Sequence, residues 1–110
     1  MVELRGYIDG DGHKPFAEWF AGLDAPAGAK VAIALTRMEQ ENFSNVKGVG
    51  AGVFEYKIDV GPGYRIYFGK DGEKLVILIG GGTKKRQQKD IAKAQACWAD
   101  YKRRNKQEKF

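Results

Sequence analysis

The sequence predicts an α+β domain in which a mostly antiparallel sheet carries an N-terminal helical hairpin and a C-terminal helix, in the order β-α-α-β-β-β-α. Apolar residues recur with helical spacing over residues 16–38 and 91–101, and with a period of two over residues 54–68. Tight-turn residues separate the period-two segments, as in β-hairpins. The 110 residues, 43% of them hydrophobic, suffice for one core, so we expect a single domain spanning residues 1–110.

The first third of the chain predicts one strand and two helices. Residues 2–8 alternate apolar and polar side chains and end in the turn Asp-Gly-Asp-Gly, which is typical of a short strand. A helix is expected after Pro15, and a second one near Pro26, because proline is favoured in the first turn of a helix. The apolar faces of the two helices are Phe16, Trp19, Phe20 and Leu23, and then Val31, Ala34, Leu35 and Met38.

The middle of the chain predicts a surface loop followed by a hairpin. Residues 42–52 are rich in glycine and show little periodicity, which favours a loop. Residues 54–58 and 64–68 then form two strands joined by the turn-rich residues 59–63. If the hairpin turns about Gly61, Lys57 lies opposite Arg65 and Glu55 lies opposite Tyr67.

A third hairpin strand and a long helix complete the fold. Residues 75–79 are apolar on both sides, as expected of a central strand covered on both faces, and the three glycines at 80–82 are expected to end it. The last helix has one apolar stripe. We expect the basic residues beyond that stripe to lie past the helix end, frayed and free of packing contacts; they are Lys102, Arg103, Arg104, Lys106 and Lys109.

The charge is distributed unevenly. The net charge is +5, but residues 1–55 carry −3 and residues 56–110 carry +8. A basic half of this size favours a polyanionic partner, with nucleic acid first and an acidic membrane or acidic protein segment after it. A solvated surface with incidental charge is the alternative.

Several classes of protein are excluded by what the sequence lacks. No apolar run approaches the roughly 20 residues of a membrane span, and no basic-then-apolar leader opens the chain, so we expect a soluble, cytoplasmic protein without a membrane partner. The single cysteine, Cys97, cannot form an internal disulfide. The single histidine, His13, sits in a turn, so neither a metal site nor a cofactor is expected.

The hairpin is the first candidate for a functional site. Its polar residues, Glu55, Lys57, Arg65 and Tyr67, project from the face opposite the apolar ones, and we expect that face to be exposed. Two cations directly opposed across a strand pair cost stability. Either Glu55 neutralises Arg65, or the cations are presented to an anion.

The second candidate lies between the last strand and the last helix. Three glycines are followed at once by cations, so backbone N–H groups and side chains could converge on a phosphate. Lysines in a first helical turn oppose the helix dipole, which favours a functional role over a simple helix start capped by Thr83. The spacing is not that of a Walker A loop.

Three motifs together resemble a known family. They are Phe54-Glu55-Tyr56-Lys57-Ile58, then Gly61-Pro62-Gly63-Tyr64-Arg65-Ile66-Tyr67-Phe68, then Leu78-Ile79-Gly80-Gly81-Gly82-Thr83-Lys84 with Gln88-Lys89-Asp90-Ile91. This pattern resembles the phage-derived killer proteins of the RelE/ParE toxin superfamily, close to HigB-type toxins. The resemblance implies a RelE-like fold and the toxin of a type II toxin–antitoxin system, partnered by a helix-turn-helix antitoxin.

The resemblance also implies an activity. Relatives enter the ribosome and cut messenger RNA by attack of a ribose 2′-hydroxyl on the adjacent phosphate. By motif position Arg65 matches the arginine that holds the scissile phosphate, Lys57 falls in the basic strand, and Lys84 matches the lysine after the last strand. The expected nucleic-acid contacts are Tyr67, Lys85, Arg86, Gln88, Lys89, Arg103 and Arg104. A ParE-like inhibitor of DNA gyrase, or a module that only binds nucleic acid or antitoxin, would share the same scaffold.

Overall fold

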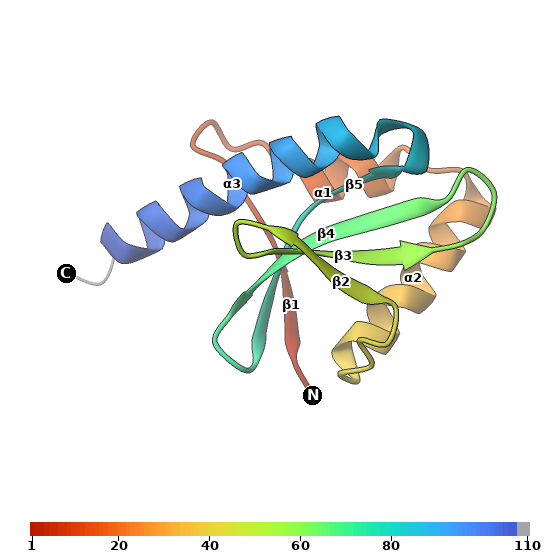
Figure 1. Ribbon diagram of the computed structural model, residues 1–110, viewed down its shortest axis with the longest axis horizontal. Coiled ribbons are helices and arrows are strands. Elements are labelled where there is room, and N and C mark those ends of the chain that lie inside the picture. Colours follow the sequence, from red (N-terminus) through yellow and green to blue (C-terminus); the bar gives the residue numbers. More distant parts are fainter. Residues whose placement is uncertain (108–110) are drawn as a thin grey trace.

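The computed structural model describes residues 1–107 and contains one five-stranded sheet with three α-helices (Figure 1). The α+β class expected from the sequence is confirmed. The elements in chain order are β1 (Glu3–Gly6), α1 (Pro15–Ala21), α2 (Ala25–Glu39), β2 (Val46–Gly50), β3 (Val53–Ile58), β4 (Tyr64–Asp71), β5 (Leu75–Thr83), a 3₁₀ turn (Lys84–Arg86) and α3 (Gln87–Gln107).

The sheet is mixed, with the strand order β1-β5-β4-β3-β2. β1 runs parallel to β5, and every other neighbouring pair is antiparallel. The register of β3 and β4 places Lys57 opposite Arg65 and Glu55 opposite Tyr67, which confirms the expected hairpin about Gly61. β5 is an inner strand, as its uniformly apolar first half predicted.

The helices α1 and α2 cover one face of the sheet. Pro15 opens α1, and the Asp24 carboxylate caps α2 by accepting a hydrogen bond of 2.9 Å from the backbone N–H of Ala27. Their apolar stripes meet the side chains that β3, β4 and β5 direct to this face. The buried residues of this core are Val2, Phe16, Val31, Ala34, Met38, Tyr56, Ile66, Phe68, Val76 and Leu78.

α3 covers the opposite face, so the expectation that this face of the hairpin is open to solvent was wrong for Glu55, Arg65 and Tyr67, whereas Lys57 is exposed. Trp98 packs so closely on β4 that a Cβ added at Gly69 would lie 2.5 Å from its indole ring. Its partners in this second core are Tyr7, Val53, Tyr67, Ile77, Ile79 and Ala94. None of the helices in the described part of the chain combines the length and the apolar composition needed to cross a membrane.

The structure adds one strand to the expected order β-α-α-β-β-β-α, and several strand boundaries differ from those expected. Residues 42–52 are not all loop, because β2 forms an edge strand there; its glycines and its mostly exposed side chains hid the period-two pattern. β5 does not end at the glycines but continues through them to Thr83. There Gly81 lies against the Trp19 ring and Gly82 against the Asp90 carboxylate, each too close for a Cβ. The glycines therefore admit neighbouring side chains instead of breaking the strand.

The basic C-terminal segment is helical through residue 107, and Arg103 and Arg104 make side-chain contacts, contrary to expectation. α3 extends to Gln107, and Asp100 pairs with Arg103 at 2.6 Å and with Arg104 at 2.8 Å. Arg104 also lies over the ring of Tyr7, whose hydroxyl donates to Asp100 at 2.5 Å. These contacts fasten α3 to the end of β1. Lys109, and the side chain of Lys106, lie outside the described part of the chain.

The contact between Tyr7 and Asp100 predicts a stability change at alkaline pH. Burial, followed by the hydrogen bond to Asp100, raises the pKa of Tyr7 to about 12 from a usual value of 10.0. The folded state therefore holds this proton more tightly, and the stabilisation is complete below pH 10 and lost as pH rises towards 12. In Tyr7→Phe we expect a shallower fall of the urea midpoint between pH 10 and 12. Some of the fall remains, because burial also raises the pKa of Tyr67. An equal fall of the urea midpoint with pH in Tyr7→Phe and in the parent protein would contradict this prediction.

Candidate nucleic-acid interface and an adjoining cleft

A buried polar network lies under the first turn of α3. The Nε of Arg65 is 2.8 Å from Oε1 of Glu55, although the direction of approach is not that of a hydrogen bond. Gln87 donates from Nε2 to both Glu55 oxygens, at 3.1 and 2.9 Å, and Arg65 Nη1 donates to the Tyr64 carbonyl at 3.2 Å. The network therefore joins β3, β4 and α3.

We expected Arg65 to be exposed to solvent, but this network buries it. Arg65 is 3% exposed, and Glu55 and Tyr67 are each 1% exposed. Of the two interpretations left open by the sequence, neutralisation of Arg65 by Glu55 is the one the structure contains. Direct contact of Arg65 with RNA would require α3 to move at its start.

The structure brings the three expected catalytic residues to one end of the sheet. Lys57 is the cross-strand neighbour of Arg65, and the backbone N–H of Lys84 donates to the Gly63 carbonyl at 2.8 Å. A Cβ at Gly63, which has φ +75°, would lie 3.3 Å from both Arg65 Nη1 and Lys84 Cβ. The absence of a side chain at Gly63 thus leaves room for Arg65 and Lys84 to lie together against the turn.

Exposed cations surround this end of the sheet. Lys57 is half exposed and its Nζ lies 3.7 Å from Asp59 Oδ1, a loose surface pair. The other exposed cations follow one another along the 3₁₀ turn and the first turn of α3, and Gln88 is exposed among them. We call this group the basic cluster: Lys57, Lys84, Lys85, Arg86 and Lys89.

Arg103 and Arg104 do not belong to the basic cluster. They lie about 25 Å along the axis of α3 from its first turn, at a rise of about 1.5 Å per residue. Both are paired with Asp100. The sequence grouped these arginines with the basic cluster by charge alone. Their distance from the cluster means that they cannot contact the same few nucleotides of an RNA strand.

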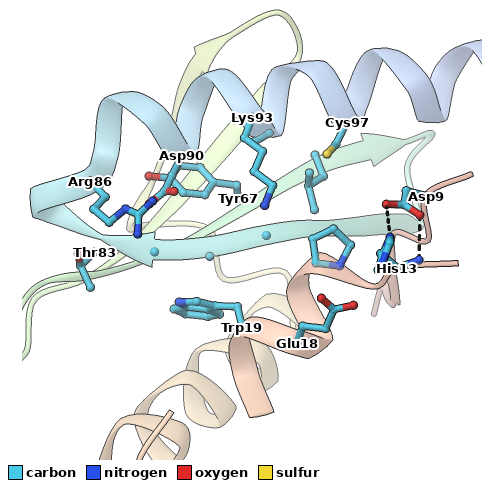
Figure 2. Close-up of a pocket in the computed structure, with 16 residues that line it drawn as sticks. Asp9, His13, Glu18, Trp19, Tyr67, Thr83, Arg86, Asp90, Lys93 and Cys97 are labelled. Carbon is cyan, nitrogen blue, oxygen red and sulfur yellow. Dashed lines mark hydrogen bonds and ion pairs between the residues drawn. The ribbon is translucent and has the colours of Figure 1, made fainter. Parts of the chain in front are cut away.

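A cleft of about 660 Å³ opens beside the basic cluster, between α1 and α3 (Figure 2). Its floor is the glycine segment of β5, residues 79–83. Trp19 of α1 forms one wall, and Asp90 and Lys93 of α3 form the other. Arg86 stands at one end and the turn that contains Asp9 and His13 stands at the other. The sequence motifs gave no sign of this cleft, because its walls come from three separate segments.

Two buried oxygens in this cleft have no hydrogen-bond partner within the described part of the chain. They are the Tyr67 hydroxyl and Asp90 Oδ2. Burial raises the pKa of Asp90, while the charges of Arg86 and Lys93 partly oppose that rise. Burial also raises the pKa of Tyr67, and the nearby Glu55 and Asp90 charges add to the rise. Both groups are therefore held in an environment that disfavours their ionised forms.

The turn at the far end of the cleft gathers possible metal ligands, where the sequence predicted none. One ligand atom each from Asp9, Asp11 and His13 lie within 4.8 Å of one another. Asp9 Oδ1 already accepts the backbone N–H groups of Asp11 and His13, and Asp9 Oδ2 lies 3.3 Å from His13 Nδ1. These contacts account for the cluster as a closed turn.

Comparison with known proteins places the chain beside a relative without an assigned activity. No family model matches the sequence. An uncharacterized protein from Haemophilus influenzae is 41% identical over 80 residues, which cover 72% of this chain and 81% of that protein. Identity at this level over most of both chains implies a common fold and ancestry. The chain belongs to the same family as this Haemophilus influenzae protein.

Proposed function

We propose that the protein has a RelE-like fold and is the toxin of a type II toxin–antitoxin system, acting as a ribosome-dependent messenger RNA endoribonuclease. The observation that carries the proposal is the meeting of Lys57, Arg65 and Lys84 at one end of the sheet, where the exposed basic cluster lies beside the buried Arg65. The three motifs of the toxin resemblance each contribute one of these residues.

The reaction needs a site that concentrates positive charge around one phosphate. The ribose 2′-oxygen forms a bond to phosphorus and loses its proton, while the bond from phosphorus to the 5′-oxygen breaks and that oxygen gains a proton. The products are a 2′,3′-cyclic phosphate and a 5′-hydroxyl end. The dianionic phosphorane between these states is stabilised by fixed cations.

We assign different roles to the three residues because their exposure differs. Lys57 and Lys84 are exposed and can reach a phosphate directly. Arg65 is buried against Glu55, so its role is to position the two strands and Gly63, which set the spacing of the lysines. The remaining members of the basic cluster would hold the flanking phosphates of the strand.

Induction of the protein in growing bacteria tests the proposal. We expect growth arrest with messenger RNA cut inside translated regions, and 5′-hydroxyl ends at the cuts. Purified protein should cut messenger only when ribosomes are added. Growth arrest with intact messenger and blocked DNA supercoiling would instead identify a gyrase inhibitor, and absence of both effects would leave a binding module.

A toxin with this basic cluster needs a neutralising partner in its own cell. We propose a helix-turn-helix antitoxin encoded beside the gene, with an acidic or helical segment that covers exposed cations. Co-expression of the neighbouring reading frame should restore growth and yield a stable complex on purification. A neighbouring frame of another kind, without rescue, would count against the partnership.

A further inference from the structure

We propose that the cleft between α1 and α3 binds a guanine base of the RNA strand whose phosphates lie on the basic cluster. This inference rests on the proposed function for its RNA, and it adds a base-reading subsite to it. Three features of the cleft carry it: a free strand edge, an unpartnered carboxylate beside an unpartnered hydroxyl, and cations at the rim.

The floor of the cleft is an unpaired strand edge. β1 pairs with β5 only along Leu75–Leu78, so residues 79–83 have a neighbouring strand, β4, on one side only. The glycines at 80–82 carry no side chains of their own; Trp19 lies against Gly81 and Asp90 against Gly82. Backbone N–H and C=O groups along an open edge can hydrogen-bond with the rim of a planar base, in the way that they would with another strand.

Asp90 selects the kind of base. The other two carboxylates that line the cleft are engaged: Asp9 accepts from its own turn, and Glu18 accepts the Lys14 backbone N–H at 2.9 Å. Asp90 has no such partner among the described residues, and neither has the Tyr67 hydroxyl. A carboxylate pairs with two adjacent N–H donors, and guanine presents these at N1 and N2. Adenine, cytosine and uracil each place an acceptor beside their donor.

The remaining walls fit a nucleotide. Trp19 offers an aromatic wall, as single-stranded RNA sites commonly do (Figure 2). Arg86 and Lys93 lie close enough to Asp90 to influence its ionisation, and they can meet the phosphate or ribose of the same nucleotide. A cleft of about 660 Å³ is within the size range of small-ligand sites, about 300–1,000 Å³.

An extended peptide added to β5 is the competing occupant of the edge. A peptide backbone would use the edge groups but would leave the Asp90 carboxylate facing its cleft without a matched pair of donors. The cations at the rim, continuous with the basic cluster, favour a polyanion. These two points favour the base.

Amide NMR spectra of the full chain, titrated with each of the four nucleoside 5′-monophosphates, test the inference. We expect GMP to shift the amides of residues 80–82 and the Trp19 indole N–H, with an affinity at least tenfold above that of the other three. Asp90→Asn should weaken GMP binding by about tenfold, since a good bidentate pair discriminates by at least that much. Tyr67→Phe should weaken it less, while Glu73→Gln, the matched change at an exposed turn, should leave it unchanged.

Several results would overturn the inference. Equal binding of the four nucleotides, shifts confined to the exposed lysines, or equal affinities in Asp90→Asn and Glu73→Gln would each do so. Cleft shifts with a blocked Val-Gly-Val-Gly peptide but not with GMP would assign the edge to strand addition instead. Thermal melts of each variant exclude misfolding. Messenger cleavage without GMP binding overturns the guanine subsite alone, whereas GMP binding without cleavage overturns the nuclease alone.

Discussion

Replacing Glu55 with alanine should destabilise the fold by about 3–5 kcal/mol, because it leaves the Arg65 guanidinium buried without its counter-charge. The Glu55 side chain has no exposed surface and the Arg65 side chain is 4% exposed, so solvent cannot compensate. Gln87 also loses the acceptor for its side-chain amide, and with it the contact that holds the start of α3 to β3. Urea unfolding measures the difference in free energy.

A control and a rescue distinguish this cause from simple loss of volume. Glu73→Ala removes a carboxylate from an exposed turn and should change stability by less than about 0.5 kcal/mol. Glu55→Met combined with Arg65→Met removes both charges and keeps the space filled, so it should recover most of the loss. A Glu55→Ala variant within about 1 kcal/mol of the parent, or a double variant as unstable as the single one, would show that the pair is not the cause.

The sequence predicted the fold well wherever side-chain periodicity reports burial. The helix faces, the hairpin register about Gly61 and the inner position of residues 75–79 all follow from local patterns. β2 was not predicted because an edge strand that contains Gly48 and Gly50 has few side chains to show an alternating pattern. The length of β5 was underestimated because a run of glycines can either end a strand or make room for side chains packed against it. Here Trp19 packs against Gly81 and Asp90 against Gly82, and the linear sequence does not show such neighbours.

The sequence placed the polar residues of the hairpin on one face but did not predict which of them are exposed. Pattern analysis placed Glu55, Arg65 and Tyr67 together on the polar face of the hairpin, and they do share a face. Whether that face meets water depends on where α3 packs, which is a long-range property. The apolar stripe of α3 had to pack against some surface of the protein. The one feature of the sequence that points to this face of the sheet is that residues 75–79 are apolar on both sides.

Replacing Lys84 with alanine should lower the rate of messenger cleavage by about 100-fold or more, the usual loss when one group that stabilises transition-state charge is removed. Lys84 follows β5 directly, and its backbone N–H is fixed by the Gly63 carbonyl at 2.8 Å, so its side chain starts from a defined point beside Arg65. Its exposure means that stability should change by no more than about 0.5 kcal/mol. Lys57→Ala should behave in the same way.

Lys74→Ala provides the matched control, because it removes the same charge from an exposed position at the other end of β5. Both variants lower the net charge by one, so a purely long-range effect of charge on ribosome binding would slow them equally and would weaken with added salt. A specific phosphate contact predicts instead that only Lys84→Ala loses single-turnover cleavage on saturating ribosomes, at every salt concentration. Equal rates for the two variants under those conditions would remove Lys84 from the catalytic site.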